Sequence, residues 1–218
     1  MDGSRETGTD RRSFLKGLAV LGVGGQVLLR SRDARGAIYA ARKEAGTLAA
    51  SEVASWPDLG RRKLGRTNFE GSRLVFGCGA ALSRGRKDDL LEAAIDAGIN
   101  VFDVGTRRYY RDAEVNLAPF LKKHRDGIFL ISKGMTYLDV GPNDSIDSSQ
   151  GREAARTWSG LLDQSLRELE VESVDAYYVM ASHNPSIVKS EEMLTAFEKA
   201  KRAGKVVHFG LSTHQNAQ

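Results

Sequence analysis

The sequence predicts an α/β protein built on a parallel sheet. From Arg73 onward, short apolar runs alternate with amphipathic segments. Parallel neighbouring strands require crossover connections of this kind. Polar residues recur directly after the predicted strands, where parallel α/β folds place their sites. A composition of 41% hydrophobic and 28% charged residues is ordinary for a globular chain. It excludes a wholly disordered tail, a collagen-like fibre and a polytopic membrane protein.

Short apolar runs rich in branched and aromatic side chains predict the strands. They are expected at residues 73–77, 99–103, 128–131, 174–180 and 206–211.

Apolar residues at helical spacing predict the helices between these strands. In the first helix Leu90, Leu91, Ala94 and Ile95 share one face, and Gly98 stands where a C-terminal cap belongs. The helices are expected at residues 87–98, 113–123, 153–169 and 191–203. Pro119 lies inside the second helix and should kink or split it.

Two segments interrupt the alternation. Residues 63–72 are expected to form a hairpin that plugs one end of the sheet. Residues 134–152 are a polar loop, and a loop of that length after a strand is more often functional than idle. Its aspartates, Asp139, Asp144 and Asp147, could suggest a calcium loop. The twelve-residue spacing with its closing glutamate is absent, however, so no metal site is predicted.

Residues 1–36 have the features of an export signal. A polar start leads to Arg11-Arg12-Ser13-Phe14-Leu15-Lys16, an apolar run at 17–29 and a basic exit. A helix needs about 20 apolar residues to span a bilayer, so no stable transmembrane anchor is expected. The string resembles the twin-arginine export motif. It predicts recognition by the twin-arginine translocation machinery, a periplasmic or other extracytoplasmic location, and a linker over residues 37–62.

The net charge of +4 belongs to the N-terminal stretch. Residues 1–62 hold 11 Lys and Arg against 7 Asp and Glu, and the remainder is balanced. A nucleic-acid footprint on the folded part is therefore not expected. The single cysteine, Cys78, excludes an intramolecular disulfide framework and a cysteine-rich zinc module.

Titratable side chains follow the predicted strands. Asp103 ends the second strand, Lys133 ends the third, and His183 follows the fourth, while Tyr109 and Tyr110 come shortly after Asp103. An ammonium near a phenol lowers the pKa of the phenol, a carboxylate can hold that ammonium, and an imidazole can orient a carbonyl. Together these groups are suited to proton transfer at a carbonyl.

Over residues 63–214 the sequence resembles the aldo-keto reductase family. The matching pieces, in the family's order and spacing, are Lys63-Leu-Gly-Arg-Thr67, Asp96-Ala-Gly-Ile-Asn100, Ile131-Ser-Lys133, Leu166-Arg-Glu-Leu169, Ala203-Gly-Lys-Val206 and Gly210-Leu-Ser212. The resemblance implies a (β/α)8 TIM barrel. It also implies reduction of a small aldehyde or ketone with NADPH, by hydride transfer with a tyrosine as proton donor.

The resemblance also implies roles for individual residues. Asp103 and Lys133 match the family's charged pair, and Tyr110 is the best match for the proton donor. Ser212 matches a residue that contacts the nicotinamide amide, and Thr213 is assigned to cofactor binding with it.

Three departures from the family pattern stand out. The tyrosine usually lies five residues after the aspartate, but position 108 is Arg. The family's strand-four histidine falls at Met180, and His183 could replace it only if the strand end bulges. About five of eight strands are present, and a barrel typically takes about 250 residues. We therefore expect a barrel truncated after about five strands, that is, a fragment of a longer protein.

Two other interpretations remain open. In a Rossmann dehydrogenase Gly77-Cys-Gly79 would bind the dinucleotide, but Leu82 replaces the third glycine and the next helix is expected only at Lys87. Alternatively, the chain is a non-catalytic exported barrel protein that binds a ligand or partner. Met180 and the displaced tyrosine favour that second interpretation.

Overall fold

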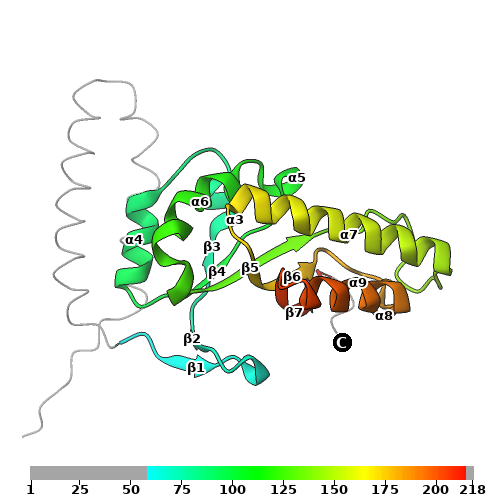
Figure 1. The fold of residues 1–218 in the computed structure, drawn as a ribbon. Helices are drawn as coiled ribbons and strands as arrows, with labels where there is room; N and C mark the ends of the chain where they lie inside the picture. Colours follow the sequence, from blue (N-terminus) through cyan, green and yellow to red (C-terminus); the bar gives the residue numbers. More distant parts are fainter. Residues whose placement is uncertain (1–57, 215–218) are drawn as a thin grey trace, which may run out of the picture. The chain divides into compact units, whose positions relative to one another are not determined.

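A computed structural model describes residues 58–214, which form an α/β fold around a five-stranded sheet (Figure 1). The sheet order is β3-β4-β5-β6-β7, and every neighbouring pair is parallel. The predicted parallel α/β fold is confirmed. The order runs in one direction, unlike the doubly wound Rossmann sheet, whose order reverses at the crevice. The predicted export signal lies outside the described residues.

The strands occupy the predicted places with some changes in length. They are β3 (Phe76–Gly77), β4 (Val101–Asp103), β5 (Phe129–Gly134), β6 (Val174–Val179) and β7 (Val206–Leu211). The prediction for 206–211 matches to the residue. Strand β3 begins later than predicted, at Phe76, and Leu74 and Val75 before it are exposed instead of packed in the sheet.

Four helices occupy the predicted segments. They are α4 (Asp88–Asp96), α6 (Ala113–His124), α7 (Ser148–Leu169) and α9 (Glu191–Arg202). Helix α7 begins earlier than predicted, because Asp147 and Gln150 form a capping box that satisfies the first amides.

Pro119 does not split α6. The helix continues through it from Ala113 to His124. Proline removes the hydrogen bond to the carbonyl four residues earlier, which is that of Val115. The Val115 side chain is exposed, so this carbonyl lies on the side of the helix where water can bond to it.

Three short helices were not predicted from the sequence. They are α3 (Cys78–Leu82), α5 (Arg107–Tyr110) and α8 (Pro185–Lys189). Each is too short to show an apolar period. Helix α8 still has a local start signal, because the Asn184 side chain accepts a hydrogen bond from the Ser186 amide and Pro185 follows at the first helical position.

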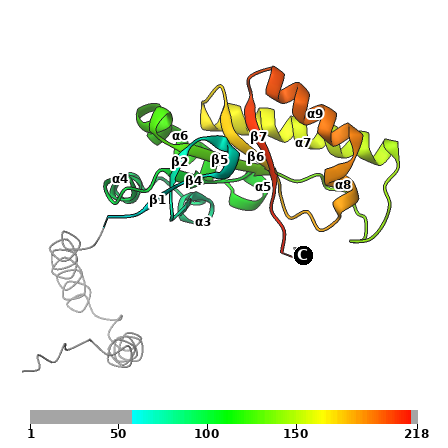
Figure 2. The same ribbon diagram turned by 90° about the horizontal axis from the view of Figure 1, so that it is seen from below.

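The long helices pack on one face of the sheet, with α7 between α6 and α9 (Figures 1 and 2). The core between them includes Phe102, Leu130, Trp158 and Tyr177, all fully buried. Cys78 is buried in the same core. No helix between residues 58 and 214 is long and apolar enough to cross a membrane.

The predicted hairpin is confirmed and packs against the other face of the sheet. It consists of β1 (Arg61–Lys63) and β2 (Glu70–Ser72), which pair antiparallel around a short 3-10 turn. Leu64 and Phe69 of the hairpin contact the second apolar cluster, formed by Val101, Phe129, Ile131 and Ala176. The rings of Phe69 and Phe129 are 5.3 Å apart, so the hairpin covers the sheet near the start of β5.

Candidate active site

Asp103 and Lys133 form an ion pair at the carboxyl ends of β4 and β5. The Lys133 Nζ atom lies 2.5 Å from both carboxylate oxygens of Asp103. The side chain of Lys133 is 8% exposed and that of Asp103 is 31% exposed. A buried ammonium requires such a partner, so this aspartate sets the charge state and position of the lysine.

Tyr110, the last residue of α5, lies beside this pair. The Lys133 Nζ atom is 5.9 Å from the centroid of the Tyr110 ring. Two glycines make room for the ring. A Cβ atom on Gly79 would lie 2.5 Å from it, and one on Gly105 would lie 3.0 Å from both the ring and the Lys133 side chain. The structure therefore brings Asp103, Lys133 and Tyr110 together.

The neighbouring Tyr109 has a different environment. Its side chain is 52% exposed, whereas Tyr110 is partly buried in the core. Arg108, which stands where the family's tyrosine usually lies, is exposed and places its guanidinium 4.5 Å from the ring centroid of Tyr137. This contact joins the loops that follow β4 and β5.

The pKa of Tyr110 is raised, chiefly by burial and also by the negative charge of Asp103. We expected Lys133 to lower it, and that expectation is wrong for this arrangement. Burial and the negative charge of Asp103 both disfavour the ionised phenol, and together they outweigh the stabilisation that Lys133 offers it. Tyr110 therefore keeps its proton at neutral pH.

His183 lies beyond the end of β6, in the turn that precedes α8. Its Nε2–H donates to the carbonyl oxygen of Val140, 3.1 Å away in the loop after β5. Met180 is buried at the strand end, where its amide donates to the Gly134 carbonyl. The chain then turns sharply at Ala181, which has a φ of 51°. His183 is thus held against the 135–147 loop.

Ser212 and Thr213 follow directly after β7. The Ser212 amide donates to Val179 and its carbonyl accepts from Ser182, both at 2.9 Å, so the ladder between β6 and β7 continues beyond the strands. Thr213 and His183 line a pocket of about 110 Å³ together with Asn184 and Leu211.

The aspartates of the long loop have structural roles. Asp144 accepts a hydrogen bond from the Gly141 amide, and Asp147 caps α7. Among residues 58–214 no group of three His, Cys, Asp or Glu side chains is arranged to hold a metal ion.

A buried polar network lies on the helix side of β5. The Ser132 hydroxyl donates to Glu114 Oε1 at 2.6 Å, and the Ser165 and Tyr177 hydroxyls are 3.1 Å apart. The other carboxyl oxygen of Glu114 is buried and has no hydrogen-bond partner in the described chain. Burial raises the pKa of Glu114 to about 7. This carboxyl group is therefore largely protonated below neutral pH.

Tyr178 is a further residue of the site that the sequence did not suggest. It pairs in register with Lys133 across β5 and β6. Its pKa is raised by burial and by the charge of Asp103. The sequence signal was only a second tyrosine in an apolar strand, and the register that places it beside Lys133 is a tertiary property.

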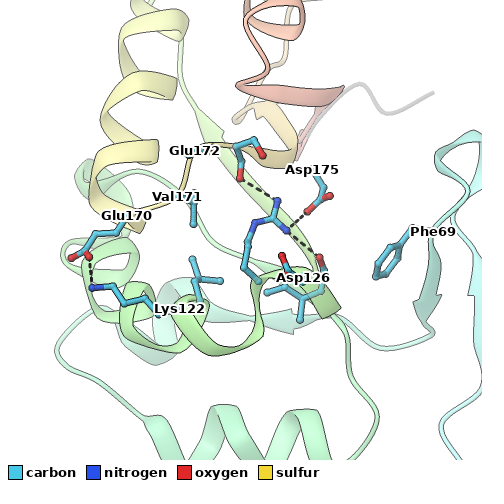
Figure 3. Close-up of a pocket in the computed structure, with 11 residues that line it drawn as sticks. Phe69, Lys122, Asp126, Glu170, Val171, Glu172 and Asp175 are labelled. Atoms are coloured by element: carbon cyan, nitrogen blue, oxygen red, sulfur yellow. Dashed lines mark hydrogen bonds and ion pairs between the residues drawn. The ribbon is translucent and has the colours of Figure 1, made fainter.

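A cavity of about 560 Å³ lies away from this site, near the amino ends of β5 and β6 (Figure 3). Lys122 and Glu170 form an ion pair at its edge. Arg125 forms an ion pair with Asp175 at 2.9 Å and donates a hydrogen bond to the Ser173 carbonyl oxygen at 3.1 Å. These bonds tie the end of α6 to β6. Sites in parallel α/β folds lie at the opposite, carboxyl ends of the strands.

Comparison with known proteins assigns the family. The sequence pattern of the aldo/keto reductase family matches residues 65–218. The chain belongs to the aldo/keto reductase family. No curated protein matches the chain in sequence.

Two solved structures have a similar fold. A Pseudomonas aeruginosa protein assigned to the aldo-keto reductases is 26% identical with a TM-score of 0.55, over 70% of this chain and 60% of that one. The holo form of an aldo-keto reductase from Bacillus halodurans is 22% identical with a TM-score of 0.55, over 72% of this chain and 51% of that one. The chain thus spans between half and two thirds of these relatives.

Proposed function

We propose that this aldo/keto reductase family member is an oxidoreductase that reduces a small aldehyde or ketone with NADPH. The observation that carries the proposal is the Asp103–Lys133 ion pair beside the Tyr110 ring, at the carboxyl end of a parallel sheet. An ammonium close to a phenol can stabilise the phenolate that is left when the phenol donates its proton. NADP in particular is supported by the resemblance of residues 63–214 to the family.

The residues after β7 fit the nicotinamide end of such a cofactor. Ser212 and Thr213 offer hydroxyl groups, which hydrogen-bond well to a carboxamide. The main chain of Ser212 is fixed by the bonds to β6, and no hydrogen bond within residues 58–214 uses its hydroxyl. A bound reduced nicotinamide would supply a hydride, that is, a proton with two electrons, to the carbonyl carbon.

Tyr110 supplies the proton that the carbonyl oxygen needs. Its raised pKa keeps the hydroxyl protonated at neutral pH, so the donor is present when the substrate binds. As the proton moves to the substrate oxygen, negative charge develops on the Tyr110 oxygen. The nearby Lys133 ammonium, held in place by Asp103, stabilises that charge. The product is an alcohol, and solvent returns a proton to Tyr110.

We propose His183 as the group that orients the substrate carbonyl. Its Nε2–H is directed to Val140, so this role requires the loop over 135–147 to exchange that bond for the substrate. His183→Gln keeps a donor and should raise KM more than it lowers kcat.

The test is NADPH oxidation, followed at 340 nm, by the full chain with 4-nitrobenzaldehyde. We expect turnover by the unchanged protein, slower turnover with NADH, and a large loss in Lys133→Met. A well-folded protein that binds NADPH but reduces no carbonyl would contradict the proposal. That result would favour the alternative, a binding protein on a barrel scaffold, which the buried Met180 at the histidine position supports.

We also propose export by the twin-arginine route, on the basis of Arg11-Arg12 and the residues around them. Replacing both arginines with Lys should retain the protein in the cytoplasm, because Lys lacks the planar guanidinium fork. Cell fractionation of the double variant tests this, with the single replacement of Arg5 by Lys as a control. Unchanged export of the double variant would defeat the idea.

A further inference from the structure

Two carboxyl groups that the proposed reaction does not use lie on the helix side of the sheet. Glu114, in the first turn of α6, is 1% exposed, and the side chain of Glu168, near the end of α7, is 15% exposed. Each has one hydrogen-bonded oxygen and one buried oxygen, Oε2, that has no hydrogen-bond partner among residues 58–214. Buried acceptors without donors are rare, because an unpaired polar atom costs free energy. A proton on one of the two carboxyl groups would supply the donor that this network lacks.

The Glu114 carboxyl group is bonded to β5 next to Lys133. The Ser132 hydroxyl donates to Glu114 Oε1 at 2.6 Å, and Ser132 directly precedes Lys133 in the strand. This bond holds the carboxyl end of β5 against the start of α6. A change in the position of Glu114 is therefore transmitted to the lysine through a single peptide unit.

The Glu168 carboxyl group is bonded to the short helix that carries Tyr110. Its Oε1 atom accepts hydrogen bonds from the Arg107 guanidinium at 3.0 Å and from the Gln164 amide group at 2.9 Å. Arg107 is the first residue of α5, and Tyr110 is the last. Because α5 has only four residues, the position of Arg107 affects that of the Tyr110 ring.

The main chain of Thr106 joins the same two elements. Its amide donates to the Lys133 carbonyl at 3.2 Å, and its carbonyl accepts from the Tyr110 amide at 3.1 Å. Thr106 is 1% exposed and directly precedes α5. Lys133 and Tyr110 thus meet at a buried junction, and the two carboxyl groups hold its two sides.

The two carboxyl groups also interact through their charges. Burial raises the pKa of Glu114 most, and the negative charge of Glu168 raises it further. Two ionised carboxylates in one buried site repel each other, so a proton held there belongs to the pair. The groups that act on Glu114 or are affected by it come from α5, β5, α7 and β6, and they are Arg107, Ser132, Ser165, Glu168 and Tyr177.

We propose that Glu114 and Glu168 form a positioning pair that shares one proton and holds Lys133 and Tyr110 in place for proton transfer. This inference rests on the proposed reductase function. Neither carboxyl group touches the substrate. With the proton present, the network has a donor and β5 and α5 are held together. When the proton is lost to solvent, repulsion between the two carboxylates displaces the elements that carry Lys133 and Tyr110.

The first experiment follows the carboxyl groups without using activity. NMR of isotope-labelled glutamate carboxyl carbons reports ionisation, and comparison with Glu114→Gln assigns the Glu114 signal. We expect its titration to move to lower pH in Glu168→Gln, which removes a repelling charge. It should move to higher pH in Ser132→Ala, which removes a hydrogen bond that favours the ionised form. A Glu114 titration that Glu168→Gln leaves unchanged would overturn the pair.

The second experiment measures kcat for NADPH-dependent reduction of 4-nitrobenzaldehyde on both sides of neutral pH. A misplacement of about 1 Å can cost about 10²-fold in rate, so we expect kcat of the unchanged protein to fall by about tenfold or more as pH rises through 7. Glu114→Gln should remove this fall, because the amide stays neutral and can still accept a hydrogen bond from Ser132. In Glu168→Gln the fall should move to lower pH, and in Ser132→Ala to higher pH.

Glu153→Gln is the matched control for the pH profile. Glu153 is an exposed glutamate of the same helix as Glu168, so this variant should keep the profile of the unchanged protein. Circular dichroism at each pH checks that every variant stays folded. If Glu114→Gln does not fold, the opposite shifts expected for Glu168→Gln and Ser132→Ala still test the pair, and shifts in the same direction would overturn it.

The two experiments separate the possible failures. A coupled titration together with a kcat profile that Glu114→Gln leaves unchanged would overturn the positioning role and leave the reductase function intact. A coupled titration in a folded protein that reduces no aldehyde would overturn the reductase function, and the positioning role with it.

Discussion

The Nζ atom of Lys133 lies 2.5 Å from each carboxylate oxygen of Asp103, and the two residues come from adjacent parallel strands. Their environments differ, because the lysine side chain is 8% exposed and the aspartate side chain is 31% exposed. Water can therefore solvate an unpaired Asp103 far better than an unpaired Lys133. The pair is asymmetric in what each partner contributes to stability.

That asymmetry predicts that the two single substitutions destabilise the fold to different extents. Asp103→Asn leaves a buried ammonium without a counter-charge and should lower the free energy of unfolding by about 3 kcal/mol. Lys133→Met leaves a carboxylate that water can reach, and its loss should be clearly smaller. Urea unfolding at pH 7 measures both. A larger loss for Lys133→Met would contradict this account of the pair.

Tyr110→Phe should lower kcat by about 10²–10⁴-fold, which is the usual cost of losing general acid catalysis. NADPH affinity should change little, because the cofactor does not need this hydroxyl. The readouts are the rate of NADPH oxidation and the quenching of protein fluorescence by NADPH.

Tyr109→Phe is the matched control and should have a mild effect, since that side chain is 52% exposed. If Tyr109→Phe were the crippling change, the assignment of the proton donor would be off by one residue.

The close packing around the Tyr110 ring predicts that alanine substitutions at Gly77 and Gly79 have different effects on stability and on kcat. Gly79→Ala places a methyl group 2.5 Å from the ring, so the ring must move away from its present position. We expect a loss of stability of about 1–3 kcal/mol and a lower kcat. Gly77→Ala is the control, because a Cβ atom there would meet nothing within 4 Å. Equal effects of the two substitutions on kcat would argue against a role of the ring position.

Glu114 predicts a dependence of stability on pH. Its folded pKa of about 7 exceeds the value of 4.5 for a free glutamate. As pH rises, the Glu114 carboxyl group therefore loses its proton at a lower pH in the unfolded chain than in the folded one. The free energy of unfolding consequently falls as pH rises from about 4.5 to about 7 and stays constant at higher pH. The full effect is about 3 kcal/mol.

Glu114→Gln should remove that decline, because the amide does not titrate and can still accept a hydrogen bond from Ser132. Urea unfolding between pH 4 and 8 measures the slope, with the exposed Glu153→Gln as a control. Parallel declines in the unchanged protein and in Glu114→Gln would refute a buried, titrating Glu114.

Periodicity along the chain was enough to determine the α/β class and the order of strands and helices. Strand β7 was predicted to the residue, and α9 to within one residue at its end. These elements are long and have a clear apolar pattern, which local sequence carries. Short motifs in the family's order and spacing also indicated the family. They predicted that Asp103 and Lys133, which end neighbouring strands, form a charged pair.

Only the tertiary structure decided which other side chains join that pair. The register of β6 on β5 places Tyr178 beside Lys133, and register depends on packing between distant segments rather than on either strand alone. Burial and the charge of Asp103 raise the pKa of Tyr110 although a lysine lies nearby. The local sequence contains the apolar periodicity that defines a helix or a strand. Contacts between elements determine which side chains lie next to one another and how deeply they are buried, and these two properties determine their chemistry.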